Sequence, residues 1–106
     1  MSEFVYLYRE ASRPPGSPQE MQERLQKWTA WFKDLEAKGH IKNLGHPLAP
    51  AGAVVKGSMR TVHDGPYAES KDIVIGYTLI EARDLAHATE LAAGCPVLES
   101  GGLVEV

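Results

Sequence analysis

The residues best suited to chemistry occupy one short stretch past the middle of the chain. It reads Asp-Gly-Pro-Tyr from Asp64 to Tyr67 and continues through Glu69 to Lys71. One interpretation of Asp64 is structural, because an aspartate that begins a Gly-Pro turn accepts backbone N–H bonds and shapes the turn. The other is catalytic: at the rim of a cavity, its carboxylate would act as a general base or anchor a ligand. The sequence leaves both interpretations open.

A second candidate is His46, which Gly45 and Pro47 place in a constrained turn. Histidine titrates close to neutral pH, so a turn that leaned toward Asp64 would give that carboxylate a catalytic partner. The alternative is a hydrated loop histidine with no such role. The other histidines are not expected to be functional: His40 follows the first helix, His87 lies on the polar side of the second, and His63 would point to the opposite face of a strand from Asp64.

Polar and aromatic side chains around the Asp-Gly-Pro-Tyr stretch are candidates for contact with a small molecule. Glu69 and Lys71 can pair with each other or offer polar contacts, while Tyr67 and Tyr77 can supply a ring wall and a hydroxyl donor. The tyrosines can equally pack with only their hydroxyls at the surface. Glycine within a strand, as at Gly76, indicates close approach of a backbone or a ligand. The candidate ligand-binding residues are therefore Pro66, Tyr67, Glu69, Lys71, Gly76 and Tyr77.

Composition excludes several other kinds of chemistry. Eleven Lys and Arg against fourteen Asp and Glu give a net charge of -3, so direct binding to nucleic acid is not expected. The chain has neither His pairs at metal-ligand spacing nor a glycine-rich phosphate loop, so neither a metal nor a cofactor is expected. The single cysteine, Cys95, reads as a small buried apolar residue. No apolar stretch is long enough for a membrane span and no signal peptide follows Met1, which favours a cytoplasmic protein.

The elements that must position these residues follow from hydrophobic periodicity. Apolar spacing of three and four residues predicts helices, and runs of β-branched and aromatic residues predict strands. In chain order we expect a strand over 4–8, a helix over 18–38, strands over 41–48 and 53–63, a turn over 64–67, a strand over 73–80, a helix over 84–93 and a strand over 103–106.

Local signals support both helices. Ser17 is a predicted N-cap, Pro18 suits the first helical position and Gly39 suits the left-handed residue after the end. Asp84 is the predicted N-cap of the second helix. Trp28, Trp31 and Phe32 are predicted to pack the first helix against a sheet.

The chain of 106 residues predicts a single α+β domain over 1–106, close to a split β-α-β-β-α-β order with one extra strand pair near the middle. Two helices can cover only one face of the resulting sheet. The first strand is apolar on both faces, with Phe4, Tyr6 and Tyr8 on one and Val5 and Leu7 on the other. We therefore expect a homodimer in which a second copy covers the remaining face.

The same stretch carries a family resemblance. It resembles the signature of YCII-related proteins with the DGPF motif, except that a tyrosine takes the place of the phenylalanine. The matching residues are Asp64-Gly65-Pro66-Tyr67-Ala68-Glu69-Ser70-Lys71, then Gly76-Tyr77 and Cys95-Pro96. The resemblance implies a ferredoxin-like α+β subunit that dimerises into an α+β barrel. In the YciI branch a histidine–aspartate pair has been proposed as catalytic. Asp64 matches the aspartate, but Trp28 stands where the helix histidine would fall.

Two functions follow as hypotheses. In the first, the protein binds a small molecule and acts as a cofactor-independent acid/base enzyme through Asp64, assisted by His46. In the second, it is a non-catalytic accessory or regulatory module that works through protein contacts. Because some family members occur near or fused to extracytoplasmic-function sigma factors, the resemblance makes a sigma factor a possible partner in that case.

Overall fold

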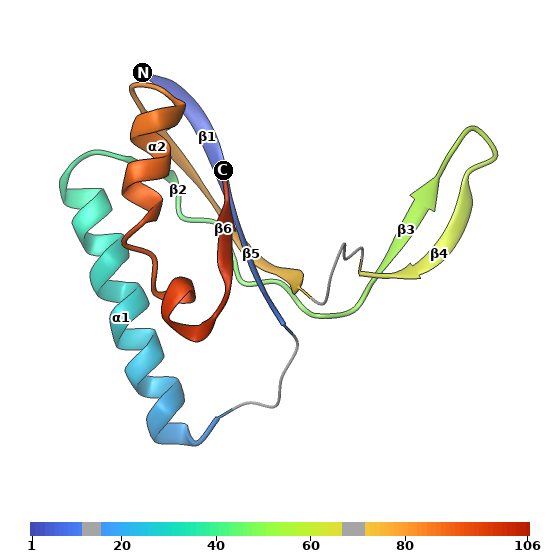
Figure 1. The fold of residues 1–106 in the computed structure, drawn as a ribbon, viewed down its shortest axis with the longest axis horizontal. Coiled ribbons are helices and arrows are strands. Elements are labelled where there is room, and N and C mark those ends of the chain that lie inside the picture. Colours follow the sequence, from blue (N-terminus) through green and yellow to red (C-terminus); the bar gives the residue numbers. More distant parts are fainter. Residues whose placement is uncertain (12–15, 67–71) are drawn as a thin grey trace.

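A computed structural model describes residues 1–11, 16–66 and 72–106 of the chain. A four-stranded sheet carries both helices on one face, and a separate hairpin extends away on the opposite side (Figure 1). The elements are, in chain order, β1 (Ser2–Ala11), α1 (Pro18–Ala37), β2 (Ile41–Asn43), β3 (Gly52–Lys56), β4 (Thr61–Gly65), β5 (Asp72–Ala82), α2 (Leu85–Ala92), the 3₁₀ helix η1 (Pro96–Ser100) and β6 (Leu103–Glu105).

The large sheet has the strand order β2-β5-β1-β6, and all neighbours run antiparallel. Without β3 and β4, the chain follows the β-α-β-β-α-β order of a ferredoxin-like fold. The β3–β4 hairpin is a two-stranded sheet of its own. The predicted fold class, a ferredoxin-like α+β subunit with an extra strand pair, is therefore confirmed.

Both helices begin at the predicted caps, and α1 ends just before Gly39 as predicted. Ser17 Oγ accepts the backbone N–H of Glu20 at 3.2 Å, and Asp84 Oδ1 accepts the backbone N–H of His87 at 2.8 Å. Each cap satisfies a donor that the first helical turn leaves unpaired. Gly39 takes a left-handed φ of 79° just after α1, as predicted.

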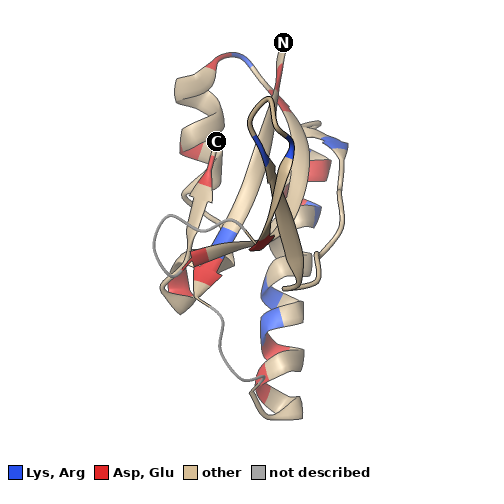
Figure 2. Cartoon of the chain, turned by 90° about the vertical axis from the view of Figure 1, so that its right-hand side faces the viewer, with Lys and Arg blue, Asp and Glu red and all other residues tan. Residues whose placement is uncertain are grey.

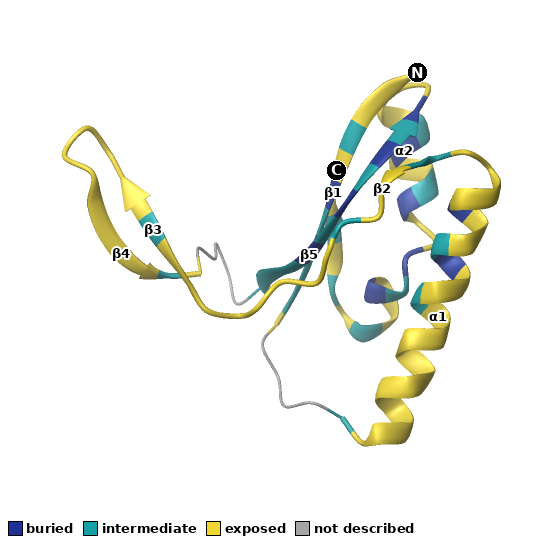
Figure 3. Cartoon of the chain, turned by 180° about the vertical axis from the view of Figure 1, so that it is seen from behind, coloured by how far each residue is buried: buried dark blue, intermediate teal, exposed yellow. Residues whose placement is uncertain are grey.

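The core lies between the helices and the inner face of the sheet (Figure 3). The Tyr6 hydroxyl donates to the carbonyl of Ala88 in α2, and its ring stacks on that of Trp31 with centroids 6.0 Å apart. This packing excludes water from most of the inner face. The buried side chains are Tyr6, Tyr8, Trp31, Leu35, Thr78, Ile80, Ala82, Ala88, Ala92, Cys95 and Val97.

No described element covers the outer face of the large sheet. Cross-strand partners share a face, and Tyr6 and Tyr8 point inward, so the alternating partners Val5–Leu79 and Leu7–Tyr77 point outward. The outward apolar side chains are Val5, Leu7, Val74, Tyr77, Leu79 and Leu103. Charged residues edge this apolar area, with Arg9 paired to Glu105 at 2.8 Å.

The prediction of one continuous strand over 53–63 was wrong. The segment forms β3 and β4, which reverse at residues 57–60. Gly57 has φ 71° and Arg60 has φ 54°, and the Arg60 N–H donates to the Gly57 carbonyl at 3.0 Å. The apolar residues of β3 (53–55) and Val62 of β4 looked like parts of one run, because the sequence alone did not show that the chain reverses between them.

Two neighbouring predictions also need correction. The strand predicted over 41–48 ends at Asn43, because Gly45 has φ 75° and leaves the extended region; only Pro47 bridges again to β5. Of the turn predicted over 64–67, Asp64 and Gly65 instead belong to β4, and Tyr67 lies outside the described residues. Pro66 follows through a cis peptide bond.

The faces of β5 also differ from the prediction. Ile73, Ile75, Tyr77 and Leu79 were expected to share one face, but a bulge opposite Tyr8 and Arg9 shifts the alternation. Tyr77 and Leu79 point outward, whereas Ile75 packs against the core cluster. The bulge therefore lets Tyr77 and Leu79 contribute to the outer face and Ile75 to the inner face.

Candidate functional site

A cavity of about 390 Å³ lies between α1 and one end of the large sheet. Its volume falls within the usual range for small-molecule sites, and its lining is mostly apolar and aromatic. Four segments supply the lining residues, which are Tyr8 and Glu10 from β1; Arg24, Leu25, Trp28 and Phe32 from α1; Leu44, Gly45, His46 and Pro47 from the segment after β2; and Ile75, Gly76, Tyr77 and Thr78 from β5.

The segment 44–47 forms one rim because β5 holds its backbone. Tyr77 N–H donates to the His46 carbonyl at 3.4 Å, and the Leu48 N–H donates to the Ile75 carbonyl at 2.8 Å. The approach is so close that a Cβ added at Gly45 would lie 1.8 Å from the Tyr77 carbonyl oxygen. Gly76 similarly admits the His46 carbonyl, 3.2 Å from the site of its missing Cβ. The sequence prediction that Gly76 marks a close backbone approach is confirmed.

A buried hydroxyl relay ties this rim to the core. Tyr8 donates its hydroxyl hydrogen to Thr78 Oγ1 at 2.7 Å, and Thr78 donates to the Leu44 carbonyl at 2.9 Å. Burial raises the pKa of Tyr8 well above its ordinary value, so the phenol remains protonated and acts as a donor. The relay satisfies both buried hydroxyls and fixes the position of Leu44 over the cavity.

Aromatic rings form the wall on the α1 side. The ring of Trp28 meets the ring of Tyr8 edge to face at 4.8 Å and lies 5.6 Å from that of Phe32. Trp28 and Phe32 are only partly buried, because the cavity takes the place of a neighbouring side chain. Flat, rigid walls of this kind suit a planar apolar ligand.

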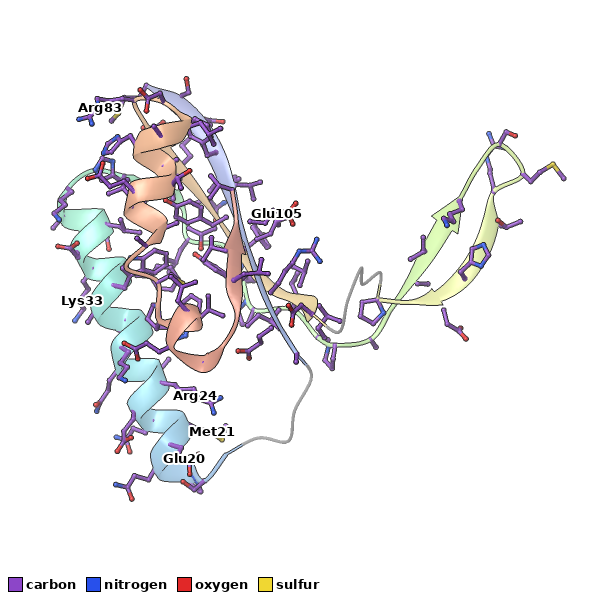
Figure 4. The ribbon with its side chains drawn as sticks, viewed as in Figure 1. Glu20, Met21, Arg24, Lys33, Arg83 and Glu105 are labelled. Atoms are coloured by element: carbon purple, nitrogen blue, oxygen red, sulfur yellow. The ribbon has the colours of Figure 1, made fainter. Side chains whose placement is uncertain are left out.

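Charge enters the cavity from two residues. Arg24 extends from α1 on the side of the strands (Figure 4). Its neighbour Lys27 is paired with Glu99 at 2.7 Å, whereas no described residue forms an ion pair or hydrogen bond with Arg24. Glu10 follows the inward alternation of Tyr6 and Tyr8 and accepts a hydrogen bond from Ser100 Oγ at 3.3 Å. A cation and a carboxylate therefore lie in a mostly apolar and aromatic lining.

The predicted site residues are only partly brought together. Gly76 and Tyr77 line the cavity, as does His46. Because Pro47 bridges to Gly76, however, His46 stands opposite Tyr77, and its ring lies beside the outward-pointing ring of Tyr77 at 6.4 Å. The imidazole thus sits at the outer edge of the rim.

Asp64 lies elsewhere. It is exposed in β4, opposite Ala53, and is not among the cavity-lining residues. In the described part of the chain no hydrogen bond or ion pair joins it to His46. Pro66 is exposed after β4. The other predicted ligand-binding residues, Tyr67, Glu69 and Lys71, lie outside the described residues.

Sequence reasoning missed most of the lining. Trp28 and Phe32 were assigned to packing alone, and Tyr8, Arg24 and Thr78 were not considered as lining residues. One signal was available, because Glu10 continues the alternation of Phe4, Tyr6 and Tyr8 on the helix-covered face. A charged residue at the end of an inward-facing series indicates a place where packing is incomplete.

The remaining candidates for chemistry are structural. Cys95 is buried as predicted, and burial raises the pKa of its thiol to about 12, which removes it as a nucleophile. Among residues 1–11, 16–66 and 72–106, no three His, Cys, Asp or Glu side chains converge on a point where a metal ion could bind. None of the described helices combines the length and apolar character needed to cross a bilayer.

In a comparison with protein families, the model of the YCII-related domain matches residues 5–106. The chain belongs to the YCII-related family. The family assignment made from the motif is thereby confirmed at that level. A search of curated proteins finds no significant match for this YCII-related chain.

Among solved structures, this YCII-related chain resembles a 5-chloro-2-hydroxyhydroquinone dehydrochlorinase from Burkholderia phenoliruptrix in complex with 2,5-dihydroxybenzoquinone. The two chains share 21% sequence identity over 97% of this chain and 92% of the other, with a TM-score of 0.43. A likeness at this level carries nothing about activity.

Proposed function

We propose that the cavity between α1 and the sheet binds a small, planar, largely apolar molecule that carries an anionic group. The aromatic wall and the volume of about 390 Å³ support the apolar part. The observation that carries the anionic part is Arg24, a guanidinium in the lining with no ion-pair partner among the described residues.

Proton transfer is the reaction that such a site supports best. Glu10 is the carboxylate among the lining residues, and the strand alternation directs it to the inner face. Asp64, the base favoured by the motif, stands on the hairpin and not in this lining. We assign the general base role to Glu10 and keep Asp64 as the competing hypothesis.

Binding is tested with benzoate and its neutral counterpart benzyl alcohol, followed by backbone amide shifts. We expect shifts at Gly45, Gly76 and Thr78, with benzoate bound more tightly. The substitution Arg24→Gln should weaken benzoate about three- to tenfold and leave benzyl alcohol unchanged, because an arginine–carboxylate bond contributes about 1 kcal/mol at a partly exposed site. Arg83→Gln, at an exposed arginine next to α2, is the matched control. Shifts confined to other residues would contradict the assignment of the site.

Catalysis is tested with phenylpyruvate, which combines a ring, a carboxylate and an acidic methylene. In D₂O a general base removes a proton from the methylene carbon, and deuterium from solvent replaces it; proton NMR follows the loss of signal. Glu10→Gln should slow this exchange at least about tenfold, while Asp64→Asn should leave it unchanged. The reverse pattern would favour Asp64. Binding without exchange would identify a binding module, the non-catalytic alternative.

We also propose that the protein is a homodimer through the outer face of the large sheet. Val5, Leu7, Leu79 and Tyr77 offer a contiguous apolar area that no described element covers. Sedimentation equilibrium should show a dimer that Val5→Asp dissociates. Met21→Asp, at an exposed position on α1, should leave it intact.

Within the family, we infer that the chain belongs to the DGPF-motif branch. Asp64, Gly65 and Pro66 match that motif, with Tyr67 in place of its phenylalanine.

A further inference from the structure

The β3–β4 hairpin, here called the arm (residues 52–65), stands apart from the rest of the molecule. Among the described elements, β3 and β4 make substantial contacts only with one another. The radius of gyration is 15.3 Å, against about 13 Å for a compact chain of this length. An isolated two-stranded hairpin is marginally stable in water, so an arm of this kind is expected to rest on another surface.

One side of the arm is apolar and open. Val55 and Val62 are cross-strand partners on the same side, with 66% and 70% of their surface exposed. Met59, in the turn at the tip, is 85% exposed. Three large apolar side chains in one short hairpin are a binding surface or an aggregation hazard.

The direction of the arm limits what can cover it. In two opposite views the helices lie on one side of the large sheet and the arm extends on the other side (Figures 1 and 3). That is the side of the outer face with Val5 and Leu79. A molecule seated on the outer face would therefore lie beside the arm.

Charge points to the kind of molecule. The tip carries Lys56 and Arg60, and the basic residues lie toward its end in Figure 2. Neither side chain forms an ion pair with any described residue. The chain has eleven basic and fourteen acidic residues, so without these two it has nine basic against fourteen acidic. A basic tip and an acidic remainder make a second copy of the same chain a complementary partner.

The backbone at the tip adds an independent observation. Arg60 has φ 54°, a conformation that costs a residue with a side chain about 1 kcal/mol relative to glycine. A turn that keeps an arginine there retains a guanidinium at an energetic cost. Such strain points to a contact made by the side chain.

From these observations we infer that the arm of each chain clasps a second copy of the chain, with Val55, Val62 and Met59 packed on that copy and the basic tip near its acidic side chains. The inference rests on the homodimer proposed above. It adds that the two chains are held by exchanged arms as well as by their sheets.

Photo-cross-linking tests the contact directly. A benzophenone amino acid replaces Met59, and equal amounts of light and isotopically heavy protein are mixed until native mass spectrometry shows exchanged dimers. We expect cross-linked peptides that join a light and a heavy chain. Cross-links only within chains of one isotope, or none, in a sample that sediments as a dimer would overturn the arm contact and leave the homodimer standing. A monomer would overturn both.

Variants test the energetics. Val55→Thr combined with Val62→Thr keeps strand propensity and should weaken dimerisation about tenfold. Val54→Thr, on the opposite side of the arm, is the matched control and should leave it unchanged. Arg60→Gly relieves the φ strain, so it should weaken the dimer only if the guanidinium contacts the second copy. An unchanged or stronger dimer in both the double valine variant and Arg60→Gly would overturn the inference.

Discussion

At the scale of single residues, Gly45 decides the shape of the cavity rim. Its φ of 75° turns the chain after β2, and its missing side chain lets the backbone reach the Tyr77 carbonyl. A side chain here would meet backbone atoms that cannot move without breaking the contact between residues 44–47 and β5. The rim therefore depends on glycine for two separate reasons.

We predict that Gly45→Ala destabilises the protein more than Gly39→Ala. Gly39 has nearly the same φ of 79°, but a Cβ there meets nothing within 4 Å. The Gly39 variant should cost about 1 kcal/mol for left-handed backbone, and the Gly45 variant about 1–3 kcal/mol more for the clash. Urea unfolding measures both, and equal losses would show that the rim is not as tightly held as the structure indicates.

The residues around Gly45 also show what the sequence could predict of the site. The Gly45-His46-Pro47 turn and the close approach at Gly76 follow from backbone rules that are local to the chain. The lining by Trp28 does not, because a partly buried aromatic residue on a helix looks the same in sequence whether it faces a side chain or a cavity. The position of Asp64 relative to this cavity could not be predicted, because a Gly-Pro sequence does not tell on which strand the preceding residue lies.

At the scale of elements, α1 serves two purposes along its length. Near its end, Leu35 is 1% exposed and packs in the core, while about two turns after its start Leu25 is 66% exposed at the cavity. The caps of α1 and its apolar spacing could be predicted from sequence. Which of its apolar residues are buried could not, because that depends on where the sheet ends beneath the helix.

We predict opposite effects for two alanine variants on α1. Leu35→Ala should cost about 2–5 kcal/mol of unfolding free energy through lost burial and the space left behind. Leu25→Ala should change it by less than about 0.5 kcal/mol, yet weaken the binding of benzyl alcohol. Denaturant unfolding and ligand titration of the same two proteins check the pair. A large stability loss in Leu25→Ala would mean that the cavity is closed in solution.

The inner face of β1 carries a pH dependence. Burial raises the pKa of Tyr6 from 10.0 to about 12, and Tyr6 is fully buried. Below pH 10.0 both the folded and unfolded chains keep the proton, so this contribution to stability is fully present. Between pH 10.0 and about 12 the unfolded chain loses the proton first, and stability falls.

We therefore predict that the unfolding free energy decreases in that window by up to about 1.4 kcal/mol per pH unit for each such tyrosine. Tyr8, whose pKa is also raised by burial, adds to the effect. Tyr6→Phe loses one hydrogen bond but should show a shallower decrease. Urea unfolding at a series of alkaline pH values measures the slope, and an unchanged slope in Tyr6→Phe would contradict the assignment.

At the scale of the whole molecule, the body and the arm are separable. The order of helices and strands along the chain outside the arm, and the caps of both helices, could be predicted from sequence because they follow from periodicity and local capping signals. The separation of the arm could not, since its apolar residues look like core residues until the structure shows them exposed. Predicting one strand over 53–63 hid the arm altogether.

We predict that the body folds without the arm. Gly52 and Gly65 are cross-strand partners, so an Asn-Gly turn can replace residues 53–64 without moving β2 or β5. At a concentration where both proteins are monomeric, the unfolding free energy should change by less than about 1 kcal/mol. Hydrogen exchange in β1 and β5 should keep its protection. Loss of that protection would show that the arm supports the sheet.

Because Gly52 pairs with Gly65, the two ends of the arm lie side by side. A hairpin of any length or composition can replace the arm, because the rest of the chain is joined only to its two ends. The affinity of one chain for another can then be changed by replacing the hairpin, while the cavity beside α1 keeps its shape. Recognition of another chain and recognition of a ligand would thus be free to diverge independently within one short polypeptide.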